Sequence, residues 1–89
     1  MEKEVVIYST DYCGYCIRAK RLLDDCGIEY EEIMASTLSH EQIVELMNKT
    51  KMRTFPQIFI FGKLVGGYTE LKALDDKAGL STVMQNKTF

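Results

Sequence analysis

Two cysteines separated by two residues, Cys13 and Cys16, stand between an apolar run and an amphipathic segment. The run at residues 5–8 is rich in β-branched side chains, which predicts a strand buried on both faces. From Gly14 to Cys26 apolar residues recur at spacings of three and four, which predicts a helix. A Cys-x-x-Cys pair that follows a strand and opens a helix indicates thiol-based redox chemistry.

The chemistry of thiol–disulfide exchange assigns a different role to each cysteine. Cys13 falls at the predicted helix N-terminus, where free backbone N–H groups and the helix dipole favour a thiolate. It is therefore the candidate nucleophile, with hydrogen bonds to its sulfur expected from the N–H groups of Tyr15 and Cys16. Cys16 lies one turn inward and is the candidate resolving cysteine, so the pair would cycle through a disulfide.

The pair could alternatively be half of a zinc site, but the other ligands are missing. A closed structural zinc site needs four ligands, and the remaining candidates are Cys26 and His40. Cys26 lies about 15 Å along the helix from Cys16, which excludes shared coordination. We expect Cys26 to pack in the core, with an accessory redox role as the alternative, and assign no function to His40.

The rest of the chain predicts three more strands and two more helices. Residues 28–31 alternate apolar and acidic side chains, as a strand with one wet face would. Ser39 and Gln42 form a capping-box pattern that predicts a helix from residue 39 to about 49. Residues 57–61 and 64–65 flank Gly62-Lys63, which predicts an antiparallel hairpin with a type II′ turn.

A last helix is expected after the glycine pair at 66–67. Thr69 would cap this helix, which would carry Leu71, Leu74 and Ala78 inward and end at Gly79. The complete order predicts an α/β, thioredoxin-like fold with a central four-stranded mixed sheet flanked by helices. A chain of 89 residues is expected to form one domain, residues 1–89, with one core.

Charge and hydropathy narrow the choice of partners. A net charge of −2 argues against nucleic acid, and no apolar run approaches the length of about 20 residues that crosses a bilayer. We expect no membrane partner and a cytoplasmic location. Two basic clusters, one after the cysteine pair and one at Lys49, Lys51 and Arg53, are solvated faces or a local attraction for a small anion.

Three motifs in order make the sequence resemble the glutaredoxin family over nearly its whole length. They are Cys13-Gly14-Tyr15-Cys16, then Thr54-Phe55-Pro56 followed by Gln57-Ile58-Phe59-Ile60, then Gly66-Gly67-Tyr68-Thr69-Glu70-Leu71. The resemblance implies a cis Phe55–Pro56 bond that faces the cysteines. It also implies a glutathione-binding groove made of Tyr15, Thr54, Phe55, Pro56, Thr69 and Glu70.

The resemblance implies a monomeric, glutathione-dependent disulfide oxidoreductase. Its substrates would be disulfide-containing or glutathionylated proteins, of which ribonucleotide reductase is an example, and glutathione would be a co-substrate rather than a bound cofactor. A redoxin served by a flavin reductase is one alternative. A non-enzymatic binding module that uses the same groove is another.

The sequence departs from the common family pattern at three places. Gly14 replaces a proline, a lysine that the family commonly carries near Thr10 is missing, and Thr69-Glu70 replaces an acidic or hydroxyl pair such as Asp-Asp. Arg53 is the candidate substitute for the lysine as a partner of a glutathione carboxylate. Small residues at position 14 accompany [2Fe–2S] cluster binding within the family, so a dimer that holds a cluster through Cys13 and glutathione is a further alternative.

Overall fold

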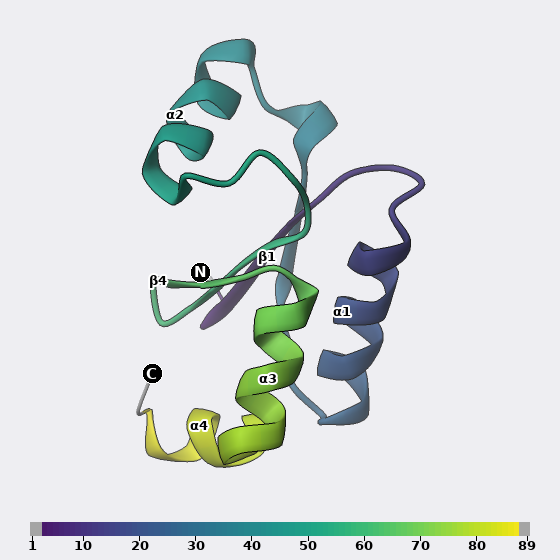
Figure 1. Cartoon of the computed structure of the whole chain (residues 1–89), viewed down its shortest axis with the longest axis vertical. Helices are drawn as coiled ribbons and strands as arrows, with labels where there is room; N and C mark the ends of the chain where they lie inside the picture. Colours follow the sequence, from purple (N-terminus) through teal and green to yellow (C-terminus); the bar gives the residue numbers. More distant parts are fainter. Residues whose placement is uncertain (1–2, 88–89) are drawn as a thin grey trace.

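The computed structural model describes residues 3–87, which form one mixed sheet with helices packed on it (Figure 1). The elements are, in order, β1 (Val5–Ser9), α1 (Gly14–Asp25), β2 (Glu31–Met34), a 3₁₀ turn (Ala35–Thr37), α2 (His40–Thr50), β3 (Gln57–Ile60), β4 (Lys63–Gly66), α3 (Tyr68–Ala78) and α4 (Leu80–Asn86). The predicted α/β, thioredoxin-like fold with a four-stranded mixed sheet is confirmed.

The strand order is β2-β1-β3-β4, with β1 parallel to β2 and antiparallel to β3. The parallel pair requires a crossover, which α1 supplies. Because α1 starts where β1 ends, the loop between them brings Cys13 to the carboxyl end of β1.

The main core lies on one face of the sheet, under α1, α3 and α4. Fully buried side chains from β1 and β3 meet Ala19, Leu23, Leu71 and Leu80 of the three helices. Figure 1 shows α1 and α3 side by side, with α2 standing apart from them. The buried stripe of α1 includes Cys16, so packing against the core holds the second cysteine in place.

Two predicted strand details are wrong. The second strand is Glu31–Met34 rather than residues 28–31, because Ile28 and Tyr30 pack against the core before the chain enters the sheet beside β1. The hairpin turn is Phe61-Gly62 rather than Gly62-Lys63. Both turn residues have positive φ, 52° and 79°, as a type I′ turn requires, and Lys63 is already paired with Ile60.

The last helices also differ from expectation. Gly67 rather than Thr69 stands at the N-cap of α3, and Ala78 is exposed, whereas Leu71 is buried and Leu74 half-buried. After Gly79 the chain forms α4 of seven residues, and this helix buries Leu80 and Val83. No helix among residues 3–87 is both long and apolar enough to span a membrane.

Candidate active site

Cys13 is the N-cap residue of α1. Its backbone is extended, and its sulfur accepts a hydrogen bond from the backbone N–H of Cys16 at 3.1 Å. N-cap side chains normally satisfy one of the orphan N–H groups of the first turn, and here a sulfur does so. The helix start therefore stabilises negative charge on this sulfur, as the sequence predicted.

The environment shifts the pKa values of the two thiols in opposite directions. Partial burial acts to raise the pKa of Cys13, but hydrogen bonds to its sulfur outweigh burial and lower it; they come from the side chain and backbone of Cys16, the side chain of Thr10 and the backbone of Tyr15. Burial and the neighbouring Cys13 sulfur raise the pKa of Cys16. Cys13 is thus the better thiolate, and Cys16 stays a thiol.

Cys16 is buried behind Cys13, with 1% of its surface exposed, whereas Cys13 is half-buried. The hydroxyl of Ser9 favours the charged form of Cys16 and so acts to lower its pKa. Ser9 is itself buried at the end of β1, and its hydroxyl has no nitrogen or oxygen partner within residues 3–87. Because Cys16 is buried and Cys13 is only half-buried, a substrate reaches the Cys13 sulfur first.

The segment before β3 faces the Cys13 sulfur. The thiol of Cys13 points at the carbonyl oxygen of Phe55, with 3.7 Å between sulfur and oxygen, and the Phe55–Pro56 peptide bond is cis as expected. The fully buried Gln57 is hydrogen-bonded to the loop before Phe55. Its Nε2 donates to the carbonyl oxygens of Met52 at 3.2 Å and Thr54 at 3.1 Å.

From the sequence, no role was assigned to Gln57, and Thr10 was considered only as the position near which the family lysine is missing. A hydroxyl at the end of a strand, three residues before a helix-capping cysteine, was a usable signal for Thr10. An amide in an otherwise apolar strand, at the residue after the proline, was a usable signal for Gln57.

The start of α3 lies beside the proline segment. A side-chain carbon added at Gly67 would lie 3.5 Å from the carbonyl oxygen of Pro56. The carboxylate of Glu70 turns back and accepts a hydrogen bond from the Gly67 N–H at 2.7 Å, so Glu70 caps the helix. Thr69 and Glu70 are both exposed at this end of α3.

Tyr15 connects α1 with α3. Its ring lies 6.2 Å from that of Tyr68, at an angle of 32°, and the Arg18 guanidinium carbon lies 5.3 Å from the centre of the Tyr15 ring. The structure thus brings Tyr15 together with α3, and Phe55 together with Cys13. Arg53 and Thr54 are exposed in the loop that joins α2 to β3.

Cys26 is half-buried and packs against the core, as expected, at the opposite end of α1 from the pair. Burial, followed by the negative charges of Asp75 and Asp25, raises its pKa. Among residues 3–87 no three His, Cys, Asp or Glu side chains gather as a metal site would require.

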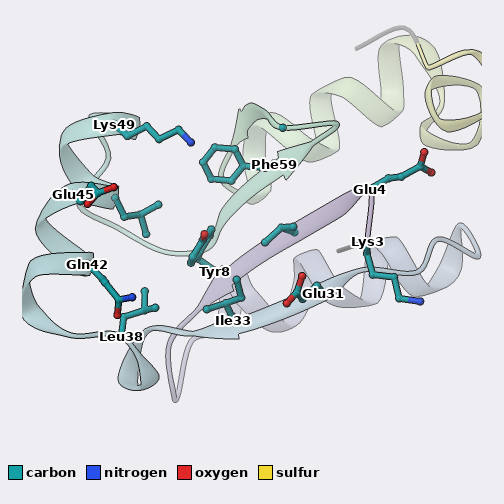
Figure 2. A pocket seen from close by; sticks show the side chains of 13 residues that line it. Lys3, Glu4, Tyr8, Glu31, Ile33, Leu38, Gln42, Glu45, Lys49 and Phe59 are labelled. Carbon is teal, nitrogen blue, oxygen red and sulfur yellow. The ribbon is translucent and has the colours of Figure 1, made fainter. Parts of the chain in front are cut away.

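A separate cavity of about 460 Å³ lies between α2 and the other face of the sheet (Figure 2). Tyr8 and Phe59 project into it from the sheet, with their ring centres 5.9 Å apart, and the Lys49 ammonium lies 5.4 Å from the Phe59 ring centre. No predicted site residue lines this cavity. The thiol chemistry takes place elsewhere.

Comparison with known proteins gives consistent results. Residues 5–65 match the glutaredoxin family model. A glutaredoxin of Pseudomonas aeruginosa is 42% identical over 80 residues, which are 90% of this chain and 94% of that protein. The solution structure of a glutaredoxin from Brucella melitensis superimposes with a TM-score of 0.81 at 39% sequence identity. The match covers 99% of this chain and 95% of the Brucella melitensis chain.

A third relative was solved with a ligand. The crystal structure of a buckwheat glutaredoxin–glutathione complex has a TM-score of 0.85 at 31% identity and covers 94% of this chain and 78% of its own.

Proposed function

This chain belongs to the glutaredoxin family and is a thiol–disulfide oxidoreductase, and we propose that glutathione is its reductant, with Cys13 as the attacking and Cys16 as the resolving thiol. One observation carries the assignment of the thiols. The half-buried Cys13 sulfur accepts the N–H of Cys16 at the start of α1, whereas Cys16 is buried behind it. Attack from Cys13 followed by release through Cys16 fits this order.

The first step is attack of the Cys13 thiolate on a disulfide. A bond forms between the Cys13 sulfur and one substrate sulfur, and the other substrate sulfur leaves as a thiolate that takes up a proton. With a glutathionylated protein, Cys13 takes the glutathione and the protein thiol is released. A second glutathione then attacks this mixed disulfide and leaves as oxidised glutathione.

A protein disulfide follows a longer route. The Cys16 thiol loses its proton and attacks the Cys13 sulfur, which releases the substrate as a dithiol and leaves a Cys13–Cys16 disulfide. Two glutathiones then reduce this disulfide, so two electrons pass from glutathione to the substrate in each cycle. The reduction potentials of glutaredoxins, about −200 to −230 mV, are close enough to that of the glutathione pool to suit this exchange.

Glutathione would lie in the space between the proline segment and α3. The Phe55 backbone beside the Cys13 sulfur would pair with the cysteine of glutathione as a strand edge pairs with a peptide, with Thr54 and Pro56 flanking it. The free N–H groups at the start of α3 would receive the γ-glutamyl carboxylate near Thr69. The Glu70 carboxylate would attract the γ-glutamyl amino group.

Tyr15 and Arg53 complete this proposed groove. Tyr15 would form one wall of this groove, beside the Tyr68 ring that lies 6.2 Å from its own. Arg53 is exposed on the loop that holds Phe55 and would attract the glycyl carboxylate of glutathione.

Cysteine variants test the proposal directly. Glutathione-dependent reduction of a small glutathione mixed disulfide is measured for wild type, Cys13→Ser and Cys16→Ser. We expect activity to vanish with Cys13→Ser and to persist with Cys16→Ser, and reduction of a protein disulfide to need both thiols. Activity with a flavin reductase system but none with glutathione would instead identify a different class of redoxin.

Gly14 favours cluster binding as a second candidate function. Apart from its chain neighbours and the backbone of α1, no heavy atom lies within 4 Å of the position that a side-chain carbon would take at Gly14, so the surface at this position is open. A thiolate such as Cys13 is the donor that iron–sulfur clusters prefer, and a [2Fe–2S] cluster bound here would store or transfer iron and sulfide. Anaerobic reconstitution with iron, sulfide and glutathione should then yield a coloured dimer, and a colourless monomer would exclude this candidate.

A further inference from the structure

The cavity between α2 and the sheet lies on the face opposite the main core. Along β1, Val5 and Ile7 enter that core, so Val6 and Tyr8 point to the other face, since alternate side chains of a strand leave it on opposite sides. There α2 leaves about 460 Å³ of space in place of a close-packed layer (Figure 2). Protein interiors hold few voids larger than a water molecule, so a cavity of this size has room for a small ligand.

Aromatic and aliphatic side chains line the inside of this cavity. The rings of Tyr8 and Phe59 meet edge to face, with 72° between their planes, and so form two adjoining walls. The aliphatic lining comes from the sheet, from α2 and from the segment before it: Val6, Ile33, Leu38 and Leu46. A molecule that fills this space gains by burying an apolar body.

The charged side chains around the cavity are not balanced. Lys3 and Glu4 each belong to an ion pair with a residue outside the lining. Glu31, Glu45 and Lys49 have no partner of opposite charge within 4 Å among residues 3–87. Two carboxylates against one ammonium leave an excess of one negative charge, which favours a cation over an anion in the cavity.

Lys49 shows which chemistry the aromatic walls accept. It reaches from α2 toward Phe59, and its ammonium lies 5.4 Å from the centre of that ring (Figure 2). A ring face attracts a cation within about 6 Å, because its π-electrons carry negative charge there. An ammonium group of the chain itself therefore already lies at this site. Its long side chain is exposed, so a ligand can displace it.

We propose that this cavity binds a small organic ammonium ion with an apolar body, such as an alkyl or aralkyl amine. The ammonium would lie against the aromatic walls near the carboxylates of Glu31 and Glu45, and the apolar body would cover Ile33 and Leu46. This binding function is separate from the thiol chemistry and goes beyond the proposed function, because Cys13 does not line the cavity.

The test is a titration of the reduced protein with 2-phenylethylamine at pH 7 and low ionic strength, followed by the amide chemical shifts. The anion of matching shape, 3-phenylpropionate, is titrated in parallel. We expect saturable shifts with the amine at Tyr8, Phe59 and Leu46, which line the cavity, and none with the carboxylate.

Variants of the charged side chains should change the Kd for the amine in opposite directions. Glu31→Gln and Glu45→Gln should each weaken binding at least about threefold, because each removes an attractive charge. Lys49→Gln should tighten binding by a similar factor, because it removes the competing cation from the Phe59 ring. Glu41→Gln is the matched control, since Glu41 is exposed on α2 outside the cavity, and it should match wild type.

Several results would overturn the proposal. These are shifts that do not saturate, a Kd for the amine that neither glutamate variant changes, and tighter binding of the carboxylate than of the amine. Opposite signs for the glutamate and lysine variants would likewise identify an anion site. The Kd for the amine should be the same in Cys13→Ser as in wild type, so this experiment and the test of the glutathione reaction can fail independently.

Discussion

The sulfur of Cys13 accepts a hydrogen bond from the backbone N–H of Cys16 at 3.1 Å. The two thiols are therefore linked, and their pKa values shift in opposite directions. The same helix turn that exposes the first sulfur to substrate buries the second. The proposed nucleophile is therefore stabilised as an anion by the backbone N–H of the proposed resolving residue.

The pH dependence of Cys13 should reveal this stabilisation. Its pKa is lowered, so its alkylation by iodoacetamide should reach half its maximal rate at a lower pH than that of an ordinary cysteine, with Cys16 reacting at higher pH. Thr10→Val removes a hydroxyl that helps to lower the pKa of Cys13 and should move the Cys13 midpoint upward. An unmoved midpoint would show that the backbone N–H groups suffice.

The same shift links pH to folding. Because the pKa of Cys13 is lower in the folded state, the thiolate stabilises the fold fully above the ordinary thiol pKa, and this contribution disappears as pH falls through the folded pKa. The free energy of unfolding can be measured by urea titration for wild type and for Cys13→Ser. The difference between the two should rise as pH increases from below the folded pKa of Cys13 to above the ordinary thiol pKa. A flat difference would contradict the shift.

Gln57→Met should separate binding from stability. Methionine has a similar shape and removes both hydrogen bonds to the loop together with the Gln57 Oε1 atom, which has no partner within residues 3–87. Loss of the two bonds leaves the carbonyl oxygens of Met52 and Thr54 without this donor, whereas loss of the buried orphan oxygen acts in the opposite direction, so the free energy of unfolding should fall by only about 1 kcal/mol. The KM for glutathione should rise about two- to tenfold as the Phe55 segment loosens, with kcat nearly unchanged.

Two glycines with positive φ offer a matched pair of alanine variants. At Gly66 (φ 126°) a side-chain carbon would lie 2.8 Å from the Cγ and Oε1 atoms of Glu70, whereas at Gly62 (φ 79°) the space is open. Both variants should lose stability through backbone strain. Only Gly66→Ala should also displace the Glu70 cap and weaken glutathione binding, as measured by the KM for glutathione.

Leu23→Ala tests the packing that fixes Cys16. Leu23 is fully buried on the stripe of α1 that also carries Cys16 and Ala19. The cavity should cost about 2–5 kcal/mol in free energy of unfolding, by chemical denaturation. Val44→Ala, at an exposed site, should cost less than about 0.5 kcal/mol. Similar losses for both would mean that the α1 contact is not part of the core.

The sequence by itself determined the elements whose causes are local. The position of Cys13 at a helix N-terminus follows from the apolar run before it and the three-to-four spacing after it, and the Ser39 cap follows from a Gln three residues later. In both cases a side chain at the helix start accepts a hydrogen bond from a backbone N–H of the first turn. The residues around each helix start are therefore sufficient to predict where the helix begins.

Only the tertiary structure decided the register of β2, the turn at Phe61-Gly62 and the contacts made by Gln57 and Thr10. Ile28 and Tyr30 look like strand residues, but the core holds them outside the sheet, and the strand starts where Glu31 comes opposite Val6. Cys13 and Phe55 are 42 positions apart in the sequence, and no residue near either one indicates that the two will meet. Strand pairing and packing of the helices bring them together, and these depend on the whole chain at once.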